Sequence, residues 1–172
     1  EKMFAVMMQS GFDLAMGEFL LDIAVGTSVM LIQPGDTLTP IRYTAVPSYH
    51  ICFDEGPNGV PDTVYRMLNR PFNVIQREWP DANVPQRMID DAAEDPTKKV
   101  GLIEATYTID GQMYYCLVTA EGDDKLVHRD LKSWPWVISR YMKASNERYG
   151  RGPVLYALAD IRTLNKVVEL TL

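Results

Sequence analysis

The sequence has 172 residues, of which 47% are hydrophobic and 23% are charged, and its net charge is −6. Chains of about 150 residues bury roughly 70% of their unfolded surface, so this length supports a hydrophobic core without disulfides or structural metals. The negative charge argues against a module that grips duplex DNA, because such affinity comes mostly from cationic groups that release counterions from phosphates.

The ends of the sequence carry no targeting or membrane signal. No apolar run approaches the roughly 18 to 20 residues that a membrane-spanning helix needs, and the first residues lack the regions of a secretory signal. We therefore expect a soluble chain with no membrane partner. The sequence begins with Glu1 and a helical pattern runs to Leu172 without a stop signal, so we interpret it as part of a longer polypeptide.

The N-terminal segment is predicted to be helical over residues 1–26. Apolar residues recur at three- and four-residue steps over residues 3–25, a spacing typical of one or two amphipathic helices. Ser10 followed by Asp13 indicates a second helix start there. Gly26 ends the stretch.

Residues 27–70 are predicted to be β-structure. A short apolar strand over residues 28–33 is closed by a Pro-Gly pair. Asn58-Gly59 tolerates positive φ, and it predicts a hairpin between strands at residues 51–53 and 64–68.

Two short helices are predicted within residues 71–95, over residues 71–79 and 85–93. Each segment opens with a proline, Pro71 or Pro85, and proline suits the first turn of a helix.

A second β region is predicted over residues 98–142. Residues 100–109 and 113–119 are rich in β-branched and aromatic residues on either side of Asp110-Gly111, which predicts a tight hairpin. Two shorter strands are expected after it, over residues 126–131 and 136–142.

The C-terminal part is predicted to be a loop over residues 143–153 and a helix over residues 154–172. The whole order indicates an α+β fold in a single domain, 1–172: N-terminal helices, mixed or antiparallel β hairpins with short helices between them, and a C-terminal helix.

No pattern of residues indicates catalysis, a cofactor or a metal. Cys52 and Cys116 lie in apolar, strand-like runs, where a buried thiol is commoner than a ligand or a nucleophile. His50 and His128 belong to no metal-spaced set, the acidic clusters lack the spacing of a calcium loop, and no phosphate-binding P-loop is present. We therefore expect no enzyme activity and no cofactor.

Aromatic residues of the predicted strands are expected to fill a core or an interface, although they could also stack on sugars or bases. They are Tyr107, Tyr114, Tyr115, Trp134 and Trp136.

Three segments near the C-terminus carry a resemblance to a known family. Residues 136–144 (WVISRYMKA), 147–153 (ERYGRGP) and 157–165 (ALADIRTLN) resemble the portal, or head-to-tail connector, proteins of short-tailed bacteriophages, the podovirus type. In that family the helix typically reads ALPDIKTLN, so Ala159 and Arg162 are mild departures. Further upstream the chain agrees with the family mainly in pattern.

This resemblance implies a structural protein of the virion that is not an enzyme. Portal proteins form a closed homo-oligomeric ring of about twelve copies at one capsid vertex. Genomic double-stranded DNA is packaged through the ring by a separate terminase and is later ejected through the attached tail, without sequence-specific binding. The implied partners are terminase, capsid, scaffolding and tail proteins, and assembly would take place in the host cytoplasm. The chain would correspond to the wing and the start of the following helix, with the stem, clip and crown beyond Leu172.

The resemblance also selects residues that are expected to be structural or to lie between subunits. They are Arg140, Tyr149, Gly150, Arg151, Gly152, Pro153, Asp160, Leu164 and Asn165. Residues 150–153 would form a stiff elbow between a strand and the last helix. Arg151 is expected to pair with a carboxylate of its own chain or of a neighbouring subunit.

Two other functions stay open. An α+β module that binds carbohydrate or protein would show saturable binding by a stable monomer. An enzyme without a readable motif would show a deep pocket that holds titratable residues with shifted pKa values.

Overall fold

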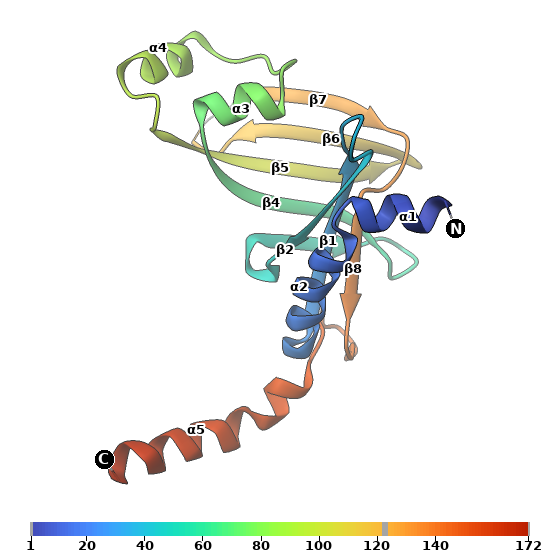
Figure 1. The fold of residues 1–172 in the computed structure, drawn as a ribbon, viewed down its shortest axis with the longest axis vertical. Coiled ribbons are helices and arrows are strands. Elements are labelled where there is room, and N and C mark those ends of the chain that lie inside the picture. Colours follow the sequence, from blue (N-terminus) through green and yellow to red (C-terminus); the bar gives the residue numbers. More distant parts are fainter. Residues whose placement is uncertain (1, 122–123, 172) are drawn as a thin grey trace. The chain divides into compact units, whose positions relative to one another are not determined.

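The structure is a computed structural model that describes residues 2–121 and 124–171 (Figure 1). The chain divides into two compact units, Glu1–Ser48 with Pro135–Leu172, and Tyr49–Trp134. Helices and two antiparallel sheets are present, with a helix at the C-terminal end, so the predicted α+β class is confirmed. The single-domain organisation over 1–172 stays a prediction, because two compact units can belong to one domain or to two.

The first unit combines a three-stranded sheet with helices. Its elements are α1 (Lys2–Gln9), α2 (Phe12–Val25), β1 (Thr27–Pro34), β2 (Ile41–Val46), β8 (Trp136–Arg140) and α5 (Pro153–Thr171). The strand order is β2-β1-β8, and β1 is antiparallel to both neighbours. β1 is buried from its first residue through Leu31, as expected for the central strand of a sheet.

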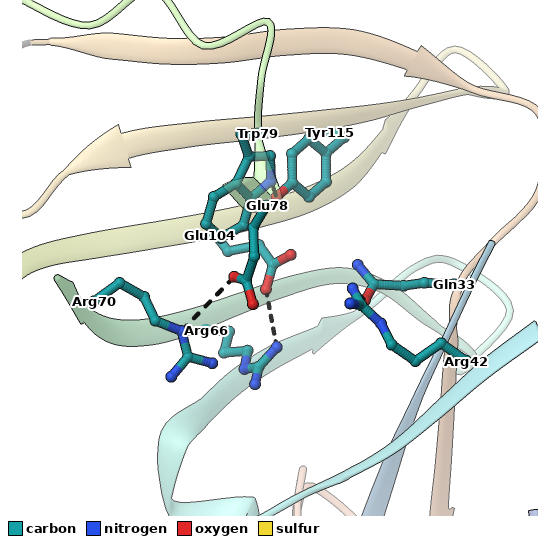
Figure 2. A network of polar contacts seen from close by, with 8 residues as sticks. All are labelled: Gln33, Arg42, Arg66, Arg70, Glu78, Trp79, Glu104 and Tyr115. Carbon is teal, nitrogen blue, oxygen red and sulfur yellow. Dashed lines mark hydrogen bonds and ion pairs between the residues drawn. The ribbon is translucent and has the colours of Figure 1, made fainter. Parts of the chain in front are cut away.

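α2 packs on this sheet through a small apolar cluster. Ala15 and Phe19 of α2 and Met30 of β1 are buried together, and the ring of Phe12 meets that of Tyr43 edge to face at 5.1 Å. Across the β1–β2 hairpin, Arg42 Nη2 donates to Gln33 Oε1 at 2.6 Å (Figure 2).

The break between α1 and α2 lies where the sequence predicts it, but the predicted cap is wrong. Gly11 precedes α2 with φ 72°, and no side chain caps the helix there. The hydroxyl of Ser10 donates to Val6 O at 2.8 Å, back into α1. Ser10 therefore ends the first helix and does not start the second, because a hydroxyl can bond the carbonyl four residues earlier.

The second unit is a five-stranded antiparallel meander with two short helices. Its elements are β3 (Ile51–Glu55), β4 (Pro61–Pro71), α3 (Phe72–Glu78), α4 (Gln86–Glu94), β5 (Lys99–Ile109), β6 (Gln112–Thr119) and β7 (Lys125–Leu131), after a short 3₁₀ turn, η1 (Ser48–His50). The strand order follows the chain, β3-β4-β5-β6-β7. Its core joins α3, α4 and the sheet through Leu68, Ile75, Trp79, Met88, Leu102, Tyr115, Leu117 and Leu126.

Both predicted hairpins are confirmed. Asp110 and Gly111 have φ values of 52° and 79°, which the mirror-image turn between β5 and β6 requires. Gly59 has φ 68° in the loop between β3 and β4. Asp-Gly and Asn-Gly are favoured at these positions because they adopt positive φ at low cost.

The prolines lie at the helix starts. Pro71 and Pro85 occupy the residue just before α3 and α4, with extended backbone angles, whereas Pro153 is the first helical residue of α5. The last strand, predicted over 136–142, ends at Arg140.

The predicted buried thiols are wrong for Cys52 and only partly right for Cys116. Cys52 is exposed and Cys116 is half-buried. Ile51 and Phe53, on either side of Cys52, are buried. Because successive side chains of a strand point to opposite faces, Cys52 lies on the outer face of the sheet.

Within residues 2–121 and 124–171, no helix combines the length and the apolar character that crossing a lipid bilayer requires.

Candidate functional site: a glycine junction and an exposed helix

The loop between β8 and α5 is fixed to the point where α2 ends and β1 begins. The amide of Gly150 donates to Thr27 Oγ1 at 2.7 Å, and the amide of Gly152 donates to Val25 O at 3.0 Å. Thr27 is 5% exposed and Gly152 is also buried. We call this contact between residues 24–27 and 150–152 the glycine junction.

The glycine junction has no room for side chains. A Cβ on Gly26 would lie 2.1 Å from Gly150 O, and a Cβ on Gly150 would lie 2.2 Å from Gly26 O. A Cβ on Gly152 would lie 2.1 Å from Ala24 O. The obstructing atoms belong to the backbone, so the two segments must separate before a side chain fits. Gly26 also has φ 149°, which other residues rarely adopt.

Further hydrogen bonds hold both ends of the loop. Tyr141 N donates to Gly26 O at 2.9 Å, and Arg151 N donates to Met142 O at 2.7 Å. Arg140, at the end of β8, donates from Nη1 to Arg148 O at 3.1 Å. The entry of the chain into α5 is therefore set by contacts at both ends of the loop.

Arg151 donates two hydrogen bonds, from Nε and Nη2, to the two carboxylate oxygens of Glu147 in the same loop. Its hydrogen bond lowers the pKa of Glu147 and raises that of Arg151. Both side chains are substantially exposed, and water screens such pairs. Arg151 therefore pairs with a carboxylate of its own chain.

α5 leaves the glycine junction as an exposed helix. Every residue from Pro153 to Thr171 is exposed except Leu158, which is half-buried. In Figure 1 this helix (red) extends away from the β2-β1-β8 sheet of its own unit. Its exposed large apolar side chains are Val154, Leu155, Tyr156, Ile161, Leu164, Val167, Val168 and Leu170. A surface of this kind marks an interaction site.

The family model described as bacteriophage head to tail connecting protein matches residues 1–172, the whole sequence. The chain belongs to this family. A search of curated proteins found no match. The resemblance that the C-terminal segments indicated is therefore confirmed, and the protein is a structural component of the virion that connects head and tail.

The structure divides the predicted site residues of this connector chain into two groups. Arg140, Gly150, Arg151 and Gly152 meet in or beside the glycine junction, where Pro153 starts α5 and Tyr149 is 40% exposed. Asp160, Leu164 and Asn165 lie further along α5 and are exposed. The sequence did not identify Gly26 and Thr27 as the partners of this loop, because no local pattern links residues so far apart.

A buried polar network lies in the second unit of the connector chain (Figure 2). Glu104 on β5 is 2% exposed, and its Oε2 lies 3.4 Å from Arg66 Nη1 on β4. The hydroxyl of Tyr115 hydrogen-bonds with Glu104 and accepts a bond from Trp79 Nε1 at 2.8 Å. Arg70 Nε lies 3.8 Å from Glu78 Oε2.

Burial decides how this network titrates. Loss of water raises the pKa of Glu104, and the charge of Arg66 opposes that rise. Burial also raises the pKa of Tyr115. The contacts fasten Trp79, directly after α3, to the middle of the sheet. Burial in the packed interior is therefore the main cause of both shifted pKa values.

A cleft of about 160 Å³ lies elsewhere in this unit, between α4 and the adjoining ends of β5 and β6. Phe72, Met88 and Val100 line it together with charged side chains, and Glu104 and Tyr115 do not. Lys98 Nζ lies 2.9 Å from Asp91 Oδ2 there. In the described part of the chain no three His, Cys, Asp or Glu side chains are grouped to hold a metal ion.

The predicted strand aromatics lie in different places. Tyr115 and Trp136 are each 4% exposed and belong to the interior. Tyr107, Tyr114 and Trp134 are half-buried. Tyr107 and Tyr114 stack at 5.6 Å across β5 and β6, and the hydroxyl of Tyr107 lies 3.2 Å from His128 Nε2. The rings of Tyr107 and Tyr114 therefore pack against each other within the chain.

Proposed function

We propose that this connector chain is the wing part of a portal subunit, which forms a closed ring of about twelve copies at one capsid vertex. DNA is packaged through the ring and ejected through it, and the tail attaches to it. The proposal includes the podovirus type of phage, assembly in the host cytoplasm, terminase, capsid and scaffolding proteins as partners, and no enzyme activity.

The exposed apolar helix held at a fixed junction carries this proposal. Eight large apolar side chains of α5 face water in the single chain, and a soluble protein seldom leaves such a surface uncovered. The glycine junction fixes how α5 starts from the end of α2 and β1, so each copy presents the helix in the same way. A ring needs identical surfaces presented identically around an axis.

The charge supports passage of DNA without tight binding. The chain carries a net charge of −6. Phosphates are held by cations that release counterions, so a chain of net negative charge is expected to bind a duplex weakly.

The test is the mass and shape of the full-length subunit purified without other phage proteins. Native mass spectrometry is expected to give one discrete oligomer of about twelve copies, and negative-stain electron microscopy is expected to show closed rings. A subunit that stays monomeric at all concentrations, or that binds a small ligand saturably as a monomer, rejects the proposal.

A further inference from the structure

The cleft beside α4 opens onto the core of the second unit. Phe72, Met88 and Val100 line it. Met88 belongs to the core and is 6% exposed, and Phe72 and Val100 pack against that core. An apolar side chain that entered the cleft would therefore leave water and meet apolar atoms that continue into the packed interior.

The size of the cleft decides which class of ligand it takes. Its volume is about 160 Å³. Pockets that bury a whole small molecule usually have about 300 to 1,000 Å³, whereas a cavity of about 150 Å³ holds one benzene ring. The cleft therefore has room for a single aromatic or leucine-sized side chain. Such a side chain, buried in a fitting pocket, is the usual anchor of a protein partner.

Carboxylates gather around Lys98 at this cleft. Asp91, Asp95 and Glu121 line the cleft together with Lys98. The hydrogen bond to Asp91 raises the pKa of Lys98, and the charges of Asp91, Glu121 and Glu94 raise it further. Several carboxylates thus act on one ammonium group, so the local field favours an additional cation.

The other cations of the lining do not reverse this field. Arg87 and Lys99 also line the cleft, and Arg87 is paired with Asp124. The charges of the lining alone cancel, because it holds three cations and three anions. Glu94 and Asp124 lie next to these groups and make the surroundings of the cleft negative.

The charges of α4 oppose the dipole of the helix. Arg87 lies in its first turn, Asp91 and Glu94 lie in its last turn, and Asp95 is the C-cap residue. The C-terminal end of a helix carries partial negative charge, so acids there cost stability unless cations offset them. Lys98 pairs with Asp91. A further cation at this end of α4 would offset the acids that remain.

We propose that the cleft binds a basic peptide segment of another protein, which inserts one aromatic or leucine side chain against Phe72, Met88 and Val100. The Lys or Arg side chains that flank this anchor face Glu94 and Glu121. The same acids repel phosphates, which argues against a nucleic acid as the occupant. This binding requires neither the ring nor α5, so it is independent of the proposed function.

Three short peptides labelled with fluorescein test the choice of ligand on the full-length subunit. The first has one tryptophan between two pairs of lysines, the second has alanine in place of the tryptophan, and the third has glutamates in place of the lysines. Fluorescence anisotropy is expected to show binding at least tenfold tighter for the first peptide than for the others. Equal affinity with and without the tryptophan overturns the inference.

The methyl group of Met88 reports where the peptide binds. The subunit is labelled at its methionine methyl groups, and Met88→Leu assigns the signal by nuclear magnetic resonance. The ring of the bound tryptophan is expected to shift this signal as the peptide is added, because Met88 lines the cleft. Saturable binding that leaves the Met88 signal in place shows that the peptide binds elsewhere and rejects the site.

Filling the cleft gives a matched pair of variants. Ala92 lines the cleft, so Ala92→Phe is expected to weaken binding of the tryptophan peptide at least tenfold. Ala93 is the next residue of α4, is exposed and does not line the cleft, so Ala93→Phe is expected to bind like the wild type. Urea denaturation checks that both variants fold. Equal affinity of the two variants contradicts the inference.

The charge of the cleft is tested without filling it. Glu121→Lys is expected to weaken the lysine peptide about fivefold and to strengthen the glutamate peptide, because it reverses one charge of the lining. Glu94→Gln is expected to weaken the lysine peptide about twofold while it raises the urea midpoint, because an acid at this end of α4 opposes the helix dipole. Unchanged affinities in both variants remove the reason for a basic partner and defeat the proposal.

A second copy of the chain is the competing occupant. A Met88 signal that shifts with protein concentration in the absence of peptide, and no longer does so in Ala92→Phe, would show a second copy in the cleft and overturn the inference. Normal rings whose cleft binds no peptide refute this inference alone. A subunit that binds the peptide at the cleft but forms no ring supports this inference and rejects the proposed function.

Discussion

Gly150 donates its amide hydrogen to the hydroxyl of Thr27 at 2.7 Å, although 123 positions separate the two residues in the chain. Thr27 is the first residue of β1, and Gly150 lies shortly before α5. A hydroxyl placed after a helix thus fixes the start of another helix that the chain reaches much later.

Thr27→Val tests this bond. Valine keeps the branched shape but removes the acceptor, so the half-buried amide of Gly150 loses its partner. We expect the free energy of unfolding to fall by about 1 kcal/mol. Urea denaturation of the purified protein measures this change. Thr27→Ser keeps the hydroxyl and is expected to lose less; equal losses for the two variants would show that the bond contributes little.

Gly152→Ala tests the close packing of the glycine junction. The new Cβ would meet Ala24 O at 2.1 Å, so the backbone segments must move apart. We expect a loss of about 2 to 3 kcal/mol in the free energy of unfolding. Ring assembly by the full-length subunit is expected to fall as well, because α5 then starts from the junction at a different angle.

Gly17→Ala is the matched control for this substitution. Gly17 lies inside α2 with nothing within 4 Å of the added Cβ. Alanine there is expected to raise stability by about 0.5 to 1 kcal/mol, because it lowers the conformational entropy of the unfolded chain. If both glycine variants behaved alike, crowding at the junction would not be the cause.

Local patterns in the sequence predicted the elements, and the structure shows why. Asp110-Gly111 marks its hairpin because both residues must adopt positive φ, a demand that the turn itself makes. Pro71 and Pro85 likewise mark the starts of α3 and α4, which begin at the next residue. Such signals need only neighbouring residues.

Contacts between distant segments could not be predicted in this way. A side chain on Gly26 or on Gly150 would clash with the backbone of the other residue, but no neighbouring residue in the sequence indicates this contact. The face of Cys52 was also hidden, because Ile51, Cys52 and Phe53 are all apolar and give no alternation to follow. Glu104 did leave a signal, a single charge within an apolar strand, and Arg66 supplied its counterpart.

The two cysteines are expected to differ in their reaction with a thiol reagent such as Ellman's reagent. Cys52 is exposed, whereas Cys116 is half-buried and burial raises the pKa of its thiol. Because the thiolate is the reactive form, Cys116 is expected to react more slowly than Cys52 in the folded protein near neutral pH. Cys52→Ser and Cys116→Ser assign the two phases. Equal rates for the two thiols in the folded protein would contradict these exposures.

Glu104→Gln is expected to change how stability depends on pH. Burial holds the pKa of Glu104 above its usual value in the folded protein, so the folded state binds its proton more tightly than the unfolded state. The stabilisation from this proton is present below the unfolded pKa and is lost as pH rises through the folded pKa. Glutamine resembles the protonated carboxyl and does not titrate. The difference between the variant and the wild type is therefore expected to shift in favour of glutamine as pH rises through that window.

Chemical denaturation at a series of pH values measures this difference. Other charged or titratable groups surround the network. They are Arg66 and Arg70 on β4, Glu78 at the end of α3, Tyr115 on β6 and Arg129 on β7. Arg66→Met is the companion variant, because it leaves the carboxylate of Glu104 buried without its cation. It is expected to cost about 3 kcal/mol at neutral pH and less as the pH falls. A constant offset between Glu104→Gln and the wild type at every pH would show that the carboxyl titrates alike in the folded and unfolded protein.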